Sequence, residues 1–168
     1  KNGTYKYKNN ITSDFIDKVA KVRWNLGGYK TPNASALNMY NAERGTLHVN
    51  NPSDGITRTN TWDGKIALIY PSDYGYASTD TACRDSMQSK TNDVYNCKNE
   101  NWLFNSAPQW TLSPYSGGAN PAFAVFSGGF VYSDFASSAI GVRPALFLKS
   151  DVVISDGYGT ESNPFILE

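Results

Sequence analysis

Two cysteines are the residues in this 168-residue chain whose type and spacing most directly suggest chemistry. Cys83 and Cys97 lie 14 positions apart and enclose the polar stretch RDSMQSKTNDVYN. Such a pair suits a disulfide, part of a metal site or a redox couple. A metal site needs more ligands than the single histidine, His48, supplies, and a redox couple usually has Cys-X-X-Cys spacing. The pair therefore favours a disulfide that clamps a loop, which indicates an oxidising, extracellular compartment.

Residues for hydrolysis are present, but no motif organises them. A Ser-His-Asp triad would have to use His48, which also reads as an ordinary surface histidine, and the chain has no Gly-X-Ser-X-Gly elbow. Asp73 and Asp80 are the candidates for a glycosidase carboxylate pair, with solvated loop acids as the alternative. Together with Asp63 they leave a structural Ca²⁺ ion open, although no EF-hand spacing is present. We expect no catalytic residue and no cofactor beyond that calcium alternative.

The stretch from Ser113 to Ile140 has an unusual composition. It contains no Lys, Glu, Gln, Met or Trp, although all five types occur elsewhere in the chain. One explanation is that exposed strands and glycine-rich turns disfavour Lys and Glu. The other is genetic: every residue type present can be encoded by a codon ending in a pyrimidine, the signature that adenine-directed mutagenesis of Asn codons would leave. Both explanations stay open at this point.

The overall composition excludes some partners. Lys plus Arg is 15 and Asp plus Glu is 15, so no basic surplus indicates nucleic acid. Aromatic residues make up 14%, with 11 Tyr, a residue favoured at binding surfaces. No apolar run approaches the roughly 20 residues of a membrane span. We expect an excised ectodomain, attached to a membrane only through an N-terminal segment that this chain does not contain.

Two helices are predicted in the first third of the chain. The first begins at Thr12 or Ser13 as its cap and carries an apolar stripe that runs as far as Leu26. The second covers Ala34 to Arg44, with Leu37 and Tyr40 facing the core and Met39 as a further candidate for that face. Both helices are expected to act as a scaffold.

Strands dominate the rest of the predicted fold, which is α+β in a single domain, residues 1–168. An aromatic hairpin is expected from Ala122–Phe126 and Gly129–Tyr132, because Ser127-Gly128-Gly129 supplies a tight turn. Asn101 to Phe104 is expected to anchor the cysteine-closed loop onto the core. Further strands are expected at Thr4–Lys8, Lys65–Tyr70, Trp110–Leu112, Gly141–Leu148 and Pro164–Leu167, the first and last of which are able to pair so that the termini meet.

Several segments resemble a known family. WTLSPYS, GVRPALFLKSDVVIS and GTESNPFIL resemble the C-type-lectin-like fold, in the formylglycine-generating-enzyme branch that includes retroelement-diversified variable proteins. MYNAERG, WDGKIALIYPSDYGYAS and NWLFN resemble surface proteins of gut Firmicutes in which such a domain follows a type IV pilin-like helix. The resemblance implies two helices packed on a mostly antiparallel sheet, with long irregular loops.

The resemblance also implies where a ligand would bind. The positions that it makes ligand-facing are Tyr115, Asn120, Phe123, Phe126, Phe130, Tyr132, Asp134 and Phe135. Alternation along strands would turn about half of them into the core instead. Trp110 and Arg143 are expected to be structural, the arginine by bonding to carbonyls near the sheet.

The function that these observations predict is a surface-displayed, non-enzymatic adhesion or ligand-binding module. Its ligand would be an unknown protein or glycan that contacts residues 113–140. One alternative is a pilin-like filament subunit whose faces contact neighbouring copies. The other is a divergent enzyme of the same fold, although no cysteine follows Cys97 to form the reactive pair of the formylglycine-generating enzymes.

Overall fold

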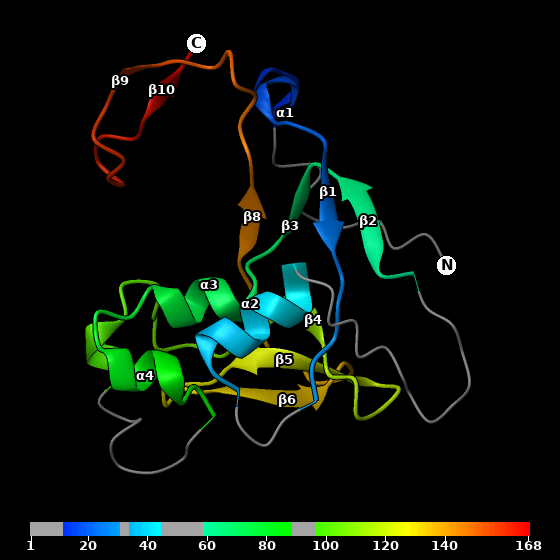
Figure 1. Cartoon of the computed structure of the whole chain (residues 1–168). Helices are drawn as coiled ribbons and strands as arrows, with labels where there is room; N and C mark the ends of the chain where they lie inside the picture. Colours follow the sequence, from blue (N-terminus) through cyan, green and yellow to red (C-terminus); the bar gives the residue numbers. More distant parts are fainter. Residues whose placement is uncertain (1–11, 31–33, 45–58, 89–96) are drawn as a thin grey trace.

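The chain folds into an α+β structure with several antiparallel strand pairs (Figure 1). A computed structural model describes residues 12–30, 34–44, 59–88 and 97–168. The α-helices within these ranges are α1 (Ser13–Lys18), α2 (Ala36–Arg44), α3 (Pro71–Tyr76) and α4 (Thr81–Asp85), with a 3₁₀ turn η2 at Lys98–Glu100. Among the described residues, no helix has the length and apolar character that crossing a membrane requires.

In the part of the chain that the structure describes, the strands group into one four-stranded sheet and three pairs. The large sheet has the order β6-β5-β4-β7, and the pairs are β1-β2, β3-β8 and β9-β10. Every pairing is antiparallel except that of β4 with β7. The strand bounds are β1 (Val22–Asn25), β2 (Thr61–Gly64), β3 (Ile66–Leu68), β4 (Gln109–Pro114), β5 (Pro121–Val125), β6 (Val131–Phe135), β7 (Gly141–Val142), β8 (Pro144–Leu146), β9 (Ile154–Asp156) and β10 (Ile166–Leu167).

The main core lies between the large sheet and the helices α2 and α3 (Figure 1). Phe123, Val125 and Val131 of the sheet are fully buried there against Met39 of α2 and Tyr74 of α3. Phe123 and Val125 alternate with Ala124, so they share the sheet face that meets the helices. The helices therefore fix the position of the β5–β6 hairpin.

The first predicted helix is largely wrong. Thr12 does cap a helix, accepting from the Phe15 N–H at 3.3 Å, but α1 ends at Lys18 and Val19 is already extended. The chain then forms β1, in which Trp24 pairs with Trp62. The apolar residues that matched a helical stripe include β-branched valines, and strand pairing with distant residues overrides the local helical pattern.

The second helix is correct in position, but of the residues expected to face inward only Met39 does so. Ala36, Met39, Ala42 and Glu43 face inward, whereas Leu37 and Tyr40 lie on the outside. Two of the four inward residues are alanines, which lets α2 approach α3 closely; the Ala36 methyl lies 2.7 Å from where a Cβ on Gly75 would be. The apolar character of Leu37 and Tyr40 therefore did not identify the buried face.

The sequence patterns predicted neither α3 nor α4. Pro71 sits at the first position of α3, where its missing N–H is harmless. The Asp73 carboxylate accepts from the Tyr70 N–H at 3.1 Å and so caps the same helix. Asp80 caps α4 by accepting from the Ala82 N–H at 2.8 Å. These capping residues were visible in the sequence, but the helices are too short for a periodic pattern.

The predicted single strand from Gly141 to Leu148 is divided in two. Gly141–Val142 (β7) joins the large sheet beside β4, and Pro144–Leu146 (β8) pairs with β3. Arg143 and Pro144 mark the crossing, and proline cannot donate to a continuous ladder. This segment therefore links two sheets instead of crossing one.

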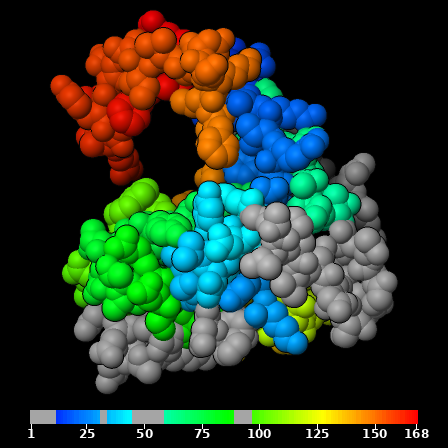
Figure 2. All heavy atoms as spheres, viewed as in Figure 1, coloured from blue at the N-terminus to red at the C-terminus, as the bar shows by residue number. Residues whose placement is uncertain are grey.

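The C-terminal residues form an arm that projects from the body of the molecule (Figures 1 and 2). Among the described residues, β9 and β10 pair only with each other. The sequence had suggested that the last strand could pair with the first one. That first strand, Thr4–Lys8, lies outside the described residues. So does the candidate ligand His48.

Candidate binding surface

The predicted aromatic hairpin is confirmed and is rigidly held. β5 and β6 pair in register from Pro121↔Phe135 to Val125↔Val131. The turn closes through the Phe126 N–H, which donates to the Phe130 carbonyl at 2.9 Å, and Gly129 takes the left-handed φ of 83°. The buried Tyr74 hydroxyl of α3 donates to the Gly129 carbonyl at 3.0 Å, which ties this turn to the helices.

Four of the predicted ligand-facing residues form what we call the β6 edge surface: Asn120, Tyr132, Asp134 and Phe135. Tyr132 is 43% exposed and Phe135 is 63% exposed, on the edge strand of the four-stranded sheet as described. Tyr132 and Asp134 share the sheet face turned away from the helices, because they pair with Ala124 and Ala122. Phe135 pairs with Pro121 and extends from the opposite face at the end of the strand, so the β6 edge surface wraps around the edge of the sheet. The Asn120 carbonyl accepts from the Ala136 N–H at 2.9 Å, which holds Asn120 next to Phe135.

Phe123 is not a ligand-facing residue, so that prediction is wrong. Its side chain has 0% exposure and lies in the main core. Tyr115, also predicted to face a ligand, is half-buried and meets the Phe123 ring edge-on at 5.8 Å between centroids. Strand alternation places Phe123 on the sheet face that meets the helices, so it is one of the residues that alternation turns into the core.

Phe126 and Phe130 form a separate cluster at the hairpin turn. Their rings are stacked at 5.1 Å with an interplanar angle of 5°. Phe130 also packs against the disulfide between Cys83 and Cys97, whose Cα atoms are 5.6 Å apart. Both rings are partly buried, and they connect the hairpin turn to the disulfide-closed segment instead of extending the β6 edge surface.

Arg143 bonds to a backbone carbonyl near the sheet. Its Nη1 donates to the Leu103 carbonyl at 2.6 Å, and its Nη2 lies 2.8 Å from the Asn105 amide oxygen when that amide is oriented to accept. Trp110 lies half-buried in β4, pairing with Ala124 and, on the other side, with Val142. Both residues support the sheet.

Trp102 differs from the expectation for its segment. Trp102 was expected to anchor the cysteine-closed loop, yet its side chain is 78% exposed. The neighbouring Leu103 and Phe104 do pack against the core, and the buried Asn101 amide donates to the Tyr74 carbonyl at 2.7 Å. The anchor is therefore real, but Trp102 points away from it.

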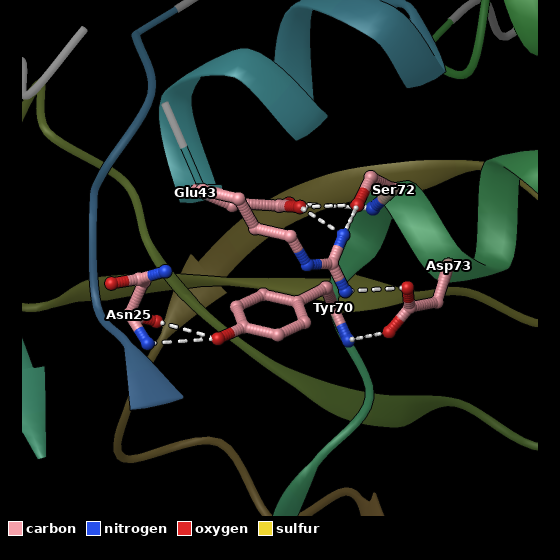
Figure 3. Close-up of polar contacts among 6 residues, drawn as sticks. Asn25, Glu43, Tyr70, Ser72 and Asp73 are labelled. Atoms are coloured by element: carbon pink, nitrogen blue, oxygen red, sulfur yellow. Dashed lines mark hydrogen bonds and ion pairs between the residues drawn. The ribbon is translucent and has the colours of Figure 1, made fainter. Parts of the chain in front are cut away.

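A buried polar cluster joins α2 to α3 (Figure 3). The Ser72 hydroxyl donates to the Glu43 carboxylate, and both side chains have 0% exposure. Arg44 donates to the Ser72 Oγ at 2.8 Å and to the Asp73 carboxylate at 2.6 Å. The Arg44 guanidinium also lies 4.0 Å from the centre of the Tyr70 ring.

The cluster extends to the first strand through Tyr70. The Tyr70 hydroxyl donates to the Asn25 carbonyl at 3.1 Å and accepts from the Asn25 N–H at 2.9 Å (Figure 3). Burial raises the pKa of Glu43 to about 7, an effect partly opposed by its bond to Ser72 and by the Arg44 charge. A serine beside a carboxylate and an arginine could take part in catalysis, but Ser72 and Glu43 are closed off from solvent, and the cluster acts as a joint between elements.

The carboxylates proposed for calcium or for glycoside cleavage are separated by their contacts. Asp63 is paired with Arg23 at 2.9 Å, Asp73 with Arg44, and Asp80 caps α4. Within residues 12–30, 34–44, 59–88 and 97–168, no group of three or more metal-ligating side chains comes together. The structure therefore adds no support to the calcium alternative.

Comparison with known proteins gives no relative from which a function could be transferred. No protein-family model, no curated protein and no solved structure matches the chain. The functional argument consequently depends on the geometry of the molecule itself.

Proposed function

We propose that this chain is a non-enzymatic ligand-binding module that recognises a protein or glycan through the β6 edge surface. The observation that carries the proposal is the exposure of two large aromatic rings, Tyr132 and Phe135, on one well-paired edge strand. Exposed aromatic side chains held on a rigid frame provide contact area with little loss of conformational entropy on binding.

The environment of the β6 edge surface supports the proposal. Behind the strand, Phe123, Val125 and Val131 are completely buried, so the exposed side chains are carried by a packed layer. The Ser113–Ile140 stretch contains no lysine or glutamate, so few charged groups would need to be desolvated when a partner binds. Asp134 and Asn120 add polar groups at the border of the rings.

The polar cluster around Glu43 favours binding over catalysis. Its shifted carboxyl and its serine are inaccessible, so a substrate could not reach them without the helices separating. The small cavity beside the disulfide is accessible to little more than a water molecule, and its lining contains no acid, histidine, lysine or arginine. Both features are typical of a packed core that holds a binding surface in place.

We propose further that the module works outside the cell, as the resemblance to C-type-lectin-like surface proteins suggests. The formed disulfide supports this location, because disulfides persist in oxidising compartments. Diversification of residues 113–140 by a retroelement belongs to the same proposal. Sister copies of the gene test it: their differences should fall mainly within 113–140, and differences concentrated elsewhere would contradict it.

A binding screen tests the main proposal directly. The purified chain is applied to a glycan array and to a panel of candidate surface proteins, and the affinity of any ligand found is measured for variants. A double substitution, Tyr132→Ala with Phe135→Ala, should weaken binding at least tenfold, roughly the effect of losing a central aromatic contact. Tyr158→Ala, which removes an exposed ring from the C-terminal arm, is the matched control. Equal affinity of the double variant and the unmodified chain would refute this assignment.

A further inference from the structure

Glu43, in the last turn of α2, has its carboxyl group in a site closed off from solvent. The Ser72 N–H donates to this carboxyl at 3.3 Å, and the Ser72 hydroxyl donates to its other oxygen (Figure 3). The Arg44 guanidinium lies 3.8 Å from the carboxyl and makes its closer ion pair with Asp73, at 2.6 Å. Among the described residues, the hydrogen bonds to the Glu43 carboxyl therefore come from one residue of α3.

The charges of this cluster do not balance when Glu43 is ionised. Within the described part of the chain, the charged and titratable groups around Glu43 are Arg44, Asp73 and Tyr70. Arg44 and Asp73 neutralise each other, and burial raises the pKa of Tyr70, so its hydroxyl stays neutral. An ionised Glu43 thus adds one uncompensated negative charge to a buried site, whereas a neutral Glu43 adds none. Burial raises the pKa of Glu43 to about 7, so the change of charge falls near neutral pH.

Helix α3 connects this carboxyl to the turn of the β5–β6 hairpin. Ser72 and Tyr74 are two residues apart in a helix of 6 residues. The buried Tyr74 hydroxyl donates to the Gly129 carbonyl at 3.0 Å. Burial also raises the pKa of Tyr74, so this hydroxyl remains a donor while Glu43 titrates. A movement of Ser72 away from Glu43 would therefore displace the group that holds Gly129.

The contact between α2 and α3 leaves little room for small adjustments. A Cβ on Gly75 would lie 2.7 Å from the Ala36 methyl group and closer still to the Met87 sulfur. The Met87 carbonyl in turn accepts from the Val131 N–H, at the start of β6, at 2.8 Å. Elements packed this closely change between discrete arrangements instead of deforming gradually. We therefore expect α3 to separate from α2 as a unit.

We propose that Glu43 is a pH-sensitive switch that controls how firmly the β5–β6 hairpin is held. With a neutral Glu43, α3 stays against α2 and Tyr74 holds the turn at Gly129. Ionisation of Glu43 favours an arrangement in which α3 moves away from α2 and the Tyr74 hydroxyl releases the Gly129 carbonyl. The switch requires no ligand. Weaker ligand binding above neutral pH is a consequence that rests on the proposed function of the β6 edge surface.

Two backbone amides of the full chain report on the two ends of this connection, without any ligand. In ¹H–¹⁵N spectra recorded over a range of pH, the Ser72 amide should shift with a midpoint of about 7, because it donates to the titrating carboxyl. The Gly129 amide should shift with the same midpoint, because its carbonyl is released as Glu43 ionises. Both shifts should be lost in Glu43→Gln, which keeps the size of the side chain and an acceptor oxygen for Ser72.

Tyr74→Phe distinguishes a switch from a local titration. This variant keeps the buried ring and removes the hydroxyl that bonds to Gly129. The Ser72 shift should remain, and the Gly129 shift should be lost. The matched control is Glu161→Gln, an exposed acid of the C-terminal arm, in which both shifts should remain.

Three results would overturn the inference. A Ser72 shift without a Gly129 shift in the unmodified chain would mean that the carboxyl is not connected to the turn. A Ser72 amide that does not titrate in the folded chain would mean that Glu43 keeps one charge state throughout. A Gly129 shift that persists in Glu43→Gln or in Tyr74→Phe would assign the titration of the turn to another group.

Discussion

At the scale of single residues, Glu43 is the group whose state should depend most on pH. Its pKa is about 7 in the folded chain against an ordinary value of 4.5, because burial disfavours the charged form. The folded state therefore holds this proton more tightly than the unfolded state. The stabilisation is complete below about pH 4.5 and is lost as pH rises through about 7, a change of about 3 kcal/mol.

The corresponding prediction concerns Glu43→Gln, which carries no titrating proton at this position. The unmodified chain should lose stability between pH 5 and pH 8 from this group, and the variant should lack that part of the slope. Urea unfolding at a series of pH values measures it, with the exposed Glu161→Gln as control. A slope that is unchanged in Glu43→Gln would show that the carboxyl is ionised in the folded state throughout this range.

A second prediction distinguishes buried from exposed aromatic residues in the segment from Ser113 to Ile140. Phe123→Ala should destabilise the fold by about 3–5 kcal/mol, because it empties a fully buried site. Phe135→Ala should cost less than about 1 kcal/mol, because its ring is mostly exposed. Denaturant midpoints compare the two directly, and similar losses would mean that Phe135 is packed and unavailable to a ligand.

At the scale of elements, the β5–β6 hairpin depends on its turn. Gly129 has a φ of 83°, and an added Cβ would lie 2.7 Å from the Cβ of Lys98. Gly129→Ala should therefore destabilise by at least about 1 kcal/mol. Gly118→Ala is the matched control, because its nearest contact is with the Pro121 side chain at 3.2 Å and its φ is not left-handed. Thermal unfolding of the two variants checks the difference, which should vanish if the turn can shift freely.

How far the sequence predicted these elements depended on how local their causes are. The hairpin was predicted well, because the Ser127-Gly128-Gly129 turn and the flanking strand residues lie within a few positions of each other. The prediction of a helix up to Leu26 was wrong. Val19 instead forms a bridge with Leu148, 129 residues away, and Trp24 pairs with Trp62, 38 residues away. Local periodicity contains no information about such partners.

The candidate site shows the same division. The sequence identified the segment that holds Tyr132 and Phe135, but it could not decide which aromatic side chains face outward. The packing of α2 and α3 against the sheet decides that Phe123 of β5 faces inward. The same packing leaves Leu37 of α2 on the outside, against expectation. Trp102 gave no signal, because its exposure results from the buried Asn101 beside it.

At the scale of the whole molecule, the disulfide couples the hairpin turn to the helices. Cys83 lies in α4, and Phe130 of the hairpin packs against the cystine. Reduction should lower stability by about 3 kcal/mol for a loop of this length, which corresponds to about 6–12 °C in Tm for a domain of this size. Scanning calorimetry with and without reductant measures the shift. Cys83→Ser with Cys97→Ser should reproduce it, and a shift near zero would mean that the bridge is dispensable.

The burial of β5 on both of its faces has a consequence for any family of such molecules. If copies of this gene vary between residues 113 and 140, the variation must skip Phe123, Ala124 and Val125, each of which is at 0% exposure. Changes would then accumulate at the exposed positions of β6 and the turn after it, such as Tyr132, Phe135 and Ser137, whereas Val131 is fully buried and Gly129 is restricted by its positive φ. The number of outward-facing positions thus limits how many different binding surfaces the fold can carry. A library of variants should randomise the codons of those positions and keep the residues of β5 constant.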